Sequence, residues 1–261
     1  MKDQKSTDES ITGRIIIGNI PVHLLTVSQL HHKVQEVIKE NKQQLFLHAN
    51  AHLIQLANYE APWLQSFFRD EVSYVMCDGS GIQLAARLLN LPIPVKIAYN
   101  VWIWTFARFL AQKGFTIFFL GADEITINKT VEQLARVEPT LRIVGASHGY
   151  FNKDKSSREN QDIIQKINAA NPDVLMVGFG MPIQEKWVKE NYADLSCRAV
   201  FTCGGAFDFI SGNKPVAPWI FRKLYLEWFF RFLLEPARLF HRVTTSNFRF
   251  AKVLLKQAQI R

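Results

Sequence analysis

The chain has 261 residues, of which 48% are hydrophobic and 21% are charged, and this composition excludes a disordered or collagen-like protein. Its three cysteines are odd in number and lack a CxxC spacing, which argues against a disulfide framework and a zinc site. The formal net charge of +8 favours an anionic partner, such as a nucleic acid, a phosphorylated substrate or an anionic membrane.

Apolar runs typical of buried strands alternate with helical segments through the first 220 residues. We predict a strand or hairpin over 14–22, followed by strands over 45–49, 72–76, 116–120, 142–145, 174–177 and 199–202. Helices are predicted between these segments, over 28–40, 53–68, 82–89, 101–112, 125–137, 161–169 and 184–191. The alternation predicts the α/β class, with a Rossmann-like, mostly parallel sheet flanked by helices.

Past Pro218 the pattern becomes purely helical, and residues 221–261 carry nine basic and only two acidic residues. A helix over 221–234 is apolar nearly all round, so something besides the sheet domain has to cover it. After Pro236, basic residues recur on one face of a helix and apolar residues on the opposite face. The basic stripe consists of Arg238, Arg242, Arg249, Lys252 and Lys256, and the apolar stripe of Phe240, Val243, Phe250, Ala251 and Leu254.

Two interpretations fit this last helix. It lies in a membrane interface with its cations at the headgroups, or it packs on the core with a solvated cationic face. We favour the first, and predict a Rossmann-like domain over 1–218 and a helical, basic, membrane-associating appendage over 219–261. The polar segment 1–10 and the lack of a stretch of about 18 uninterrupted apolar residues predict neither a signal peptide nor a spanning helix. The expected location is therefore cytoplasmic, peripheral on the inner face of the cell membrane.

Polar residues and glycines follow most of the predicted strands, at the edge where open parallel sheets bind ligands. Asp78 follows one strand and precedes two glycines that leave space for a ligand. At that edge its carboxylate suits a general base, and the alternative is a cap for the helix that begins nearby. Cations and backbone N–H groups suit phosphates, which makes candidates of Lys96, Gln184, Gly178, Gly180 and Gly204.

Other chemistries lack their motifs. The glycines near Asp78 and Gly178 fail the dinucleotide fingerprint, because Leu84 and Ile183 take the third glycine position. A nucleotide-dependent oxidoreductase on a doubly wound sheet stays the alternative function. No DxD triplet, HExxH motif or His/Cys cluster predicts a metal, and no GxSxG motif predicts acyl transfer. We expect no nucleic-acid partner, because the surplus of positive charge is confined to one amphipathic helix.

Several segments, taken in order, resemble the WecG/TagA/CpsF family of bacterial glycosyltransferases. They are HANAHLI, CDGSGIQLA, FFLGADE, GYF, PDVLMVGFGMPIQEKW, CGGAFDFISG, APW and LEWFFRFLLEPAR, within residues 14–245. The resemblance implies transfer of an N-acetylmannosamine-type sugar from a UDP donor to undecaprenyl-diphosphate-linked GlcNAc, with inversion and without a cofactor or a required metal. The two substrates and the membrane surface are then the expected partners, and a homo-oligomer is compatible with the sequence.

The resemblance also implies roles for single residues. Asp78 matches the family's proposed catalytic base, and Asn50 matches an active-site Asn beside the sugar. Lys96 stands where the family usually has an Arg near the diphosphate, Gln184 matches the Gln of a G-x-P-x-Q-E segment, and Asp208 matches a nucleotide-side contact.

Two basic residues of the appendage and three departures complete the comparison. Arg231 and Arg238 match residues that in the family close over the active site and dock on the membrane. His48, which we include among the substrate-binding residues, replaces a usual Thr, Tyr99 replaces a common Gly, and Val216 replaces the Arg of R-A-P. These departures bear on the identity of the sugar more than on the class of reaction.

Overall fold

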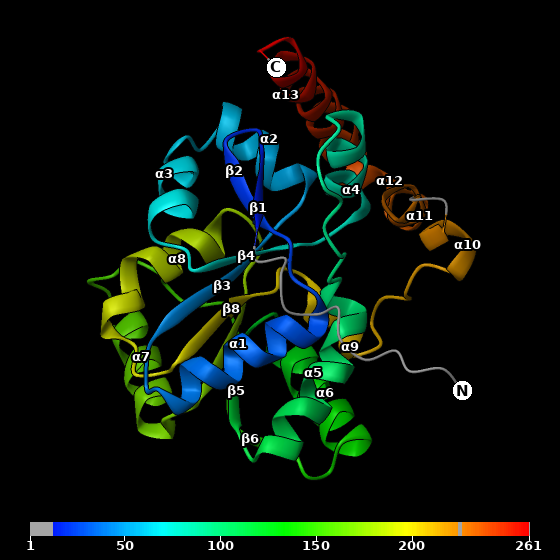
Figure 1. Cartoon of the computed structure of the whole chain (residues 1–261). Coiled ribbons are helices and arrows are strands. Elements are labelled where there is room, and N and C mark those ends of the chain that lie inside the picture. Colours follow the sequence, from blue (N-terminus) through cyan, green and yellow to red (C-terminus); the bar gives the residue numbers. More distant parts are fainter. Residues whose placement is uncertain (1–12, 224–225, 261) are drawn as a thin grey trace, which may run out of the picture.

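A six-stranded sheet forms the centre of the molecule, a computed structural model that describes residues 13–223 and 226–260 (Figure 1). The spatial order of the strands is β4-β3-β8-β7-β5-β6, and every neighbouring pair is parallel. The strands are β3 (Gln44–Ala49), β4 (Tyr74–Cys77), β5 (Thr116–Gly121), β6 (Arg142–Ser147), β7 (Val174–Gly178) and β8 (Ala199–Thr202). The predicted α/β class with a Rossmann-like parallel sheet is confirmed.

Helices cover both faces of this sheet, and together they enclose two hydrophobic cores. One face is covered by α1 (Val27–Lys39), α5 (Tyr99–Lys113), α6 (Glu124–Val137) and α9 (Ala206–Ile210). The other face is covered by α2 (Ala51–Tyr59), α3 (Trp63–Asp70), α4 (Ser80–Leu88), α7 (Arg158–Ala170) and α8 (Ile183–Asn191), which a short 3-10 turn (Tyr192–Asp194) follows. Strand side chains alternate between the cores, so Leu45 and Leu47 of β3 enter one core and Phe46 the other.

An antiparallel hairpin of β1 (Arg14–Ile17) and β2 (Ile20–His23) contributes to the core that lies between the sheet and helices α2, α3, α4, α7 and α8. Its two-residue turn, Gly18 and Asn19, has φ values of +53° and +68°. Such left-handed pairs match the twist of the flanking strands, and they favour glycine and asparagine. Asn58 of α2 donates to the carbonyl of Gly18 at 2.8 Å and so fixes the hairpin to the sheet domain.

In the sheet domain, two local predictions were wrong. The single helix expected over 53–68 is two helices, α2 and α3, because Pro62 lacks the N–H that a continuing helix needs. Helix α9 was not predicted, since its five residues are too few to establish a helical period.

The C-terminal region contains four helices and one π-helical turn among the described residues. They are α10 (Trp219–Lys223), α11 (Glu227–Leu234), α12 (Pro236–His241), the π-helical turn (Arg242–Ser246) and α13 (Asn247–Ile260). The prediction of one helix over 221–234 was wrong, because α10 ends at Lys223 and α11 begins at Glu227, with Leu226 outside any helix. Pro236 begins α12 as expected, but the turn interrupts the continuous helix that the basic and apolar stripes predicted.

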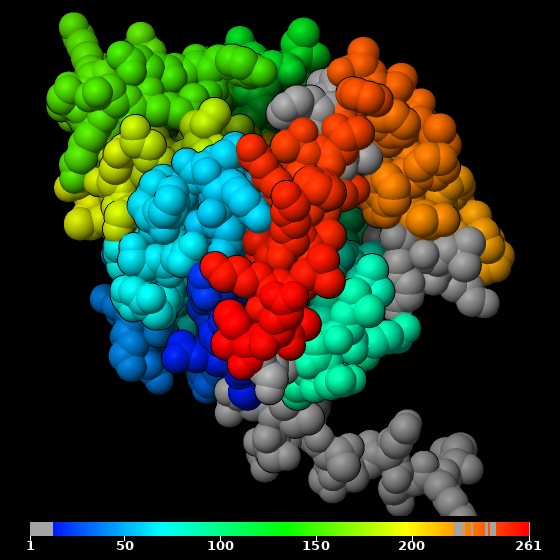
Figure 2. All heavy atoms as spheres, turned by 90° about the horizontal axis from the view of Figure 1, so that it is seen from above, coloured from blue at the N-terminus to red at the C-terminus, as the bar shows by residue number. Residues whose placement is uncertain are grey.

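Helix α13 lies across α2, α4 and the hairpin (Figure 2). Phe250, Val253 and Leu254 are buried in the same core as the hairpin. Gln257 accepts a hydrogen bond from the N–H of Gly18 at 2.9 Å and donates to the carbonyl of Ile16 at 2.7 Å. Residues of the predicted apolar stripe, Phe250 and Leu254, are therefore packed on the protein core, as the second interpretation has it, and are not open to a membrane. The division into 1–218 and 219–261 stays a prediction.

Candidate active site

The chain leaves the neighbouring strands β3 and β8 toward opposite faces of the sheet. Helix α2, after β3, packs on one face, and α9, after β8, packs on the other. Such a reversal opens a crevice at the carboxyl ends of the strands, where α/β sheets bind ligands. Asn50, Asp78 and Gly204 follow β3, β4 and β8, so the structure brings these three predicted residues to one edge.

Asp78 stands directly beyond β4 with a carboxylate that is 27% exposed. Its N–H donates to the carbonyl of Ala49 at 2.9 Å, which ties it to the end of β3. The N-cap of α4 is Gly79, and no side chain caps that helix. Asp78 therefore does not play the capping role that was the alternative, and its carboxylate can meet a ligand.

His48 lies beside Asp78 and is only 3% exposed. Its Nδ1 is 2.8 Å from the carbonyl oxygen of Thr202 in β8, and its Nε2 is 3.7 Å from Oδ2 of Asp78. Because a carbonyl oxygen only accepts, Nδ1 carries the hydrogen, and a neutral ring then presents the lone pair of Nε2 to Asp78. Burial lowers the pKa of His48 below its usual value, against the smaller opposing effects of Asp78 and the Thr202 carbonyl. The ring is therefore neutral near pH 7.

Tyr99, another departure from the family pattern, packs on His48 with 5.1 Å between ring centroids. Its hydroxyl is buried and has no hydrogen-bond partner in the described part of the chain. Burial raises the pKa of Tyr99, and the nearby acidic groups of Cys203, Asp78 and Glu185 raise it further. Tyr99, Cys203, Asp78 and Glu185, which come from four different segments of the chain, thus lie close to one another.

Asn50 and Lys96 reach the edge from either side of Asp78. The Oδ1 of Asn50 accepts from the N–H of Leu53 at 3.0 Å and so caps α2. Lys96 pairs through its backbone with Cys77 at the end of β4, and its Nζ donates to Oγ of Ser80 at 3.3 Å. The ammonium group is therefore held at the start of α4, within reach of a ligand at Asp78.

Gln184 is fully buried and connects the loops that follow β7 and β8. Its Oε1 accepts from the N–H of Gly180 at 3.3 Å and of Gly204 at 2.9 Å. In this structure these two N–H groups bind Gln184 instead of facing a phosphate. Both glycines have positive φ values, +84° and +55°, and open space where a Cβ would stand. Gly178 differs, because an added Cβ would lie 2.6 Å from the ring of Phe207.

Glu185 is a further polar residue of this edge, and it was not among the predicted site residues. It is fully buried, its Oε1 accepts from Nε2 of Gln184 at 2.7 Å, and burial raises its pKa to about 7. Its Oε2 has no hydrogen-bond partner in the parts of the chain that the structure describes. One signal was available in the sequence: Val188 follows one helical turn later, which puts Glu185 on the apolar face.

Asp208, in α9, is the residue predicted to contact the nucleotide. Its Oδ2 is 2.8 Å from Nζ of Lys214, which is also 3.2 Å from a carboxylate oxygen of Glu235. This pair of contacts joins α9 to the loop after α11. The side chains of Arg231 and Arg238 lie outside the described residues, so their predicted roles stay predictions.

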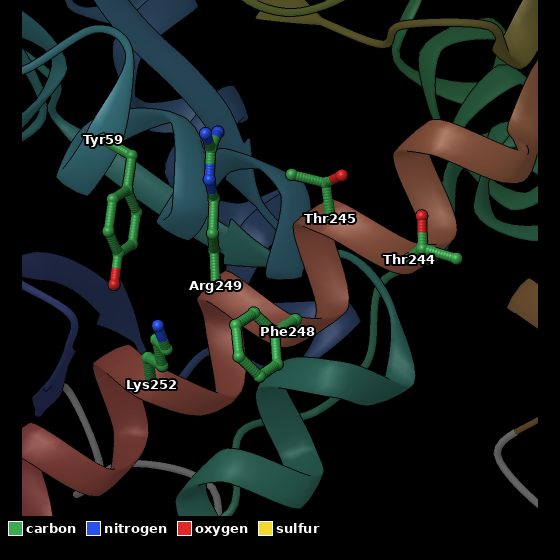
Figure 3. A pocket seen from close by; sticks show the side chains of 6 residues that line it. All are labelled: Tyr59, Thr244, Thr245, Phe248, Arg249 and Lys252. Atoms are coloured by element: carbon green, nitrogen blue, oxygen red, sulfur yellow. The ribbon is translucent and has the colours of Figure 1, made fainter.

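A second hollow, of about 500 Å³, lies between the end of α2 and the start of α13 (Figure 3). It is lined by Tyr59, Thr244, Thr245, Phe248, Arg249 and Lys252, and we call it the α2–α13 groove. The guanidinium of Arg249 lies 5.3 Å above the ring of Tyr59 and pairs with Glu60, and Nζ of Lys252 lies 4.5 Å above the ring of Phe248. The groove thus combines cations with aromatic rings.

Residues 13–223 and 226–260 lack two features, a cluster of metal ligands and a membrane-spanning helix. No group of three His, Cys, Asp or Glu side chains there is arranged to hold a metal ion. Within the same ranges, no helix has the length and apolarity that crossing a bilayer demands.

Comparison with known proteins gives a family match and several relatives. The family described as "Glycosyl transferase WecG/TagA/CpsF family" matches residues 15–261. A relative from Bacillus spizizenii is 30% identical over 81% of this chain and 79% of its own length. Relatives from Bacillus subtilis and Staphylococcus aureus are 36% and 24% identical, over 64% and 89% of this chain and 62% and 89% of their own lengths. All three are named N-acetylglucosaminyldiphosphoundecaprenol N-acetyl-beta-D-mannosaminyltransferase.

Proposed function

Because the chain belongs to the WecG/TagA/CpsF family of glycosyl transferases, we propose that it moves an N-acetylmannosamine-type sugar from a UDP donor to GlcNAc linked to undecaprenyl diphosphate. The names of the relatives supply the sugar and the acceptor. The observation that carries the proposal is Asp78, a partly exposed carboxylate at the ligand-binding edge of the sheet, next to a buried neutral histidine.

Asp78 acts as the general base. A hydroxyl of the acceptor GlcNAc gives its proton to the carboxylate while its oxygen attacks the anomeric carbon of the donor sugar. The new C–O bond forms as the bond to the UDP oxygen breaks, and the electron pair leaves with UDP. Attack from the face opposite the leaving group inverts the anomeric carbon.

The state of the neighbouring carboxyls supports this single displacement. A double displacement needs a nucleophile in addition to a base. Glu185 is fully buried and Asp208 is paired with Lys214, so among these three carboxyls Asp78 alone is both partly exposed and not paired with a lysine or arginine. One exposed carboxylate suits a mechanism that needs one base.

The donor is held without a metal ion in this proposal. Lys96 contributes positive charge for the diphosphate, although a lysine gives a point charge where an arginine would give a bidentate fork. Asp208 contacts the nucleoside side, and Gln184 keeps the glycine loops at 180 and 204 in place around the space beside them. Gly180 and Gly204 line that space, and Gly178, at the end of β7, lies against Phe207 and lets the loops come close together. His48 and Asn50 lie beside the sugar.

The acceptor brings the enzyme to the inner face of the cell membrane. Trp228, Phe229, Leu233 and Leu234 of α11 are exposed, with Leu233 at 55%. Aromatic and aliphatic side chains of this kind insert at the headgroup boundary, where nearby cations bind anionic lipids. Lys252 of the α2–α13 groove is a further exposed cation of the C-terminal region, and in this proposal residues 219–261 form the membrane-associating part.

Replacement of Asp78 tests the proposal. Asp78→Asn keeps the shape of the side chain and removes the base, so we expect release of UDP, assayed with lipid-linked GlcNAc, to fall by about 100-fold or more. Thermal stabilisation by UDP should persist in the variant. Full activity of the variant would remove Asp78 as the base, and stabilisation of the wild type by NAD but not by UDP would favour the oxidoreductase alternative.

A further inference from the structure

The arrangement of His48 and Asp78 leaves two hydrogen-bond acceptors facing each other. The Nδ1–H group of His48 is committed to the Thr202 carbonyl at 2.8 Å, so Nε2 has only its lone pair to offer. The Asp78 carboxylate, 3.7 Å away, also has only lone pairs while it is ionised. Neither group can donate to the other, so a hydrogen bond between them forms only after one of them has taken up a proton.

We propose that His48 is a positioning residue that accepts a hydrogen bond from the carboxylic acid group of Asp78 once Asp78 has taken the proton of the acceptor hydroxyl. The inference rests on the proposed function, in which Asp78 is the base. The hydroxyl O–H bond breaks, the proton becomes the O–H of Asp78, and Nε2 of His48 accepts from that group. No other reactant enters, and the proton returns to water after the products leave.

The physical effect is on the strength of the base. A hydrogen bond made only to the neutral form of a carboxyl favours that form and so makes the carboxylate a better proton acceptor. The position of His48 suits this role because the ring cannot turn away: the Thr202 carbonyl holds one edge and the ring of Tyr99 packs 5.1 Å from it. Its burial excludes water that would otherwise compete for Nε2.

Of the other titratable groups near the pair, the thiols and Tyr99 stay in one state around neutral pH, whereas Glu185, whose pKa burial raises to about 7, changes state there. Burial raises the pKa of the Cys77 and Cys203 thiols and of Tyr99, so all three are neutral. Lys96 is the cation on this side, held at Ser80. The groups that face the pair are Cys77 of β4, Tyr99 of α5, Cys203 after β8, Lys96 of the loop before α5 and, through Tyr99, Glu185 of α8.

His48→Asn provides the test, because an asparagine amide can still donate to the Thr202 carbonyl from the δ position but has no acceptor at the ε position. We expect kcat to fall by about 10-fold to 100-fold with the KM for the UDP-sugar unchanged. The acid limb of the pH–rate profile should move to lower pH, since Asp78 loses the bond that favours its protonated form. His32→Asn, the same substitution at an exposed histidine of α1, is the matched control and should keep the wild-type profile.

The outcomes separate this inference from the proposed function. A His48→Asn variant with wild-type kcat and pH profile, alongside an inactive Asp78→Asn variant, overturns the role of His48 and leaves Asp78 as the base. A change in KM alone, or a loss of activity that matches the fraction of unfolded protein, also overturns it. An active Asp78→Asn variant instead defeats the function from which the inference starts.

Discussion

At the carboxyl edge of the sheet polar side chains are buried, whereas on α11 large apolar side chains are exposed. The buried polar side chains at the sheet edge are His48, Gln184 and Glu185. The exposed apolar side chains on α11 include Trp228 and Leu233. Each arrangement costs free energy in an isolated molecule, because buried polar groups need partners and exposed apolar groups order water.

The two regions therefore differ in how this cost in free energy is offset. The edge satisfies most of its polar groups internally, as Gln184 does with two glycine N–H groups and Glu185, so its structure is preorganised before a substrate binds. The exposed side chains of α11 are not covered by the described part of the chain, and in our proposal the membrane covers them. Changes at the edge should thus appear in stability and turnover, and changes on α11 in membrane binding.

The largest effect is expected on α11. Replacement of Trp228, Phe229 and Leu233 by Ser together should weaken binding to vesicles of anionic lipid by about 3 kcal/mol, or roughly 100-fold, if each side chain is half-buried in the lipid. Flotation or sedimentation with the vesicles measures this. Turnover of a short-chain, water-soluble acceptor should be unchanged. Ile125→Ser, which alters an exposed apolar residue of α6, is the control, and an equal loss in that variant would refute a specific role for α11.

A smaller effect, on stability, is expected at Gln184. Gln184→Ala leaves two half-buried N–H groups and the buried carboxyl of Glu185 without their partner, which should lower the free energy of unfolding by about 2 kcal/mol. Urea denaturation followed by circular dichroism gives this value. Gln161→Ala on the exposed side of α7 should change it by less than about 0.5 kcal/mol. An unchanged stability of Gln184→Ala would mean that the loops do not depend on this amide.

The smallest effect compares two lysines of α13. Lys252 lines the α2–α13 groove, while Lys256 lies one turn further along, exposed and outside it. Lys252→Ala should weaken binding to phosphatidylglycerol vesicles by about 1 kcal/mol, or roughly 5-fold, and Lys256→Ala by clearly less. Equal losses would show that only the net charge of the helix matters and that the groove has no particular role.

Much of the edge was predictable because the carboxyl ends of parallel strands come together whatever the details of packing. Asn50 and Asp78 each follow an apolar run, and their proximity needed only the order of strands and helices. The state of His48 was not predictable in this way. The carbonyl that fixes its tautomer belongs to Thr202, 154 residues later in the chain.

The C-terminal helices mark a second limit of the sequence. Periodicity places Phe250 and Leu254 opposite Lys252, but it cannot say which neighbour covers the apolar stripe. The neighbour turns out to be the core around the hairpin and α2. Conversely, the exposed apolar residues of α11 agree with the expectation that this helix needs a cover from outside the sheet domain.

The contact of α13 with the hairpin also has a consequence for synthesis. Gly18 and Gln257 are 239 residues apart in the chain and are joined by a hydrogen bond, beside Val253 in the core. Contacts of such long sequence separation form late and slowly, because a long loop must close first. During translation, part of the apolar surface of the hairpin and α2 stays exposed until α13 has been synthesised. The docking of α13 is thus a late step of folding, and nascent chains that lack α13 should be bound by chaperones that recognise exposed apolar surface.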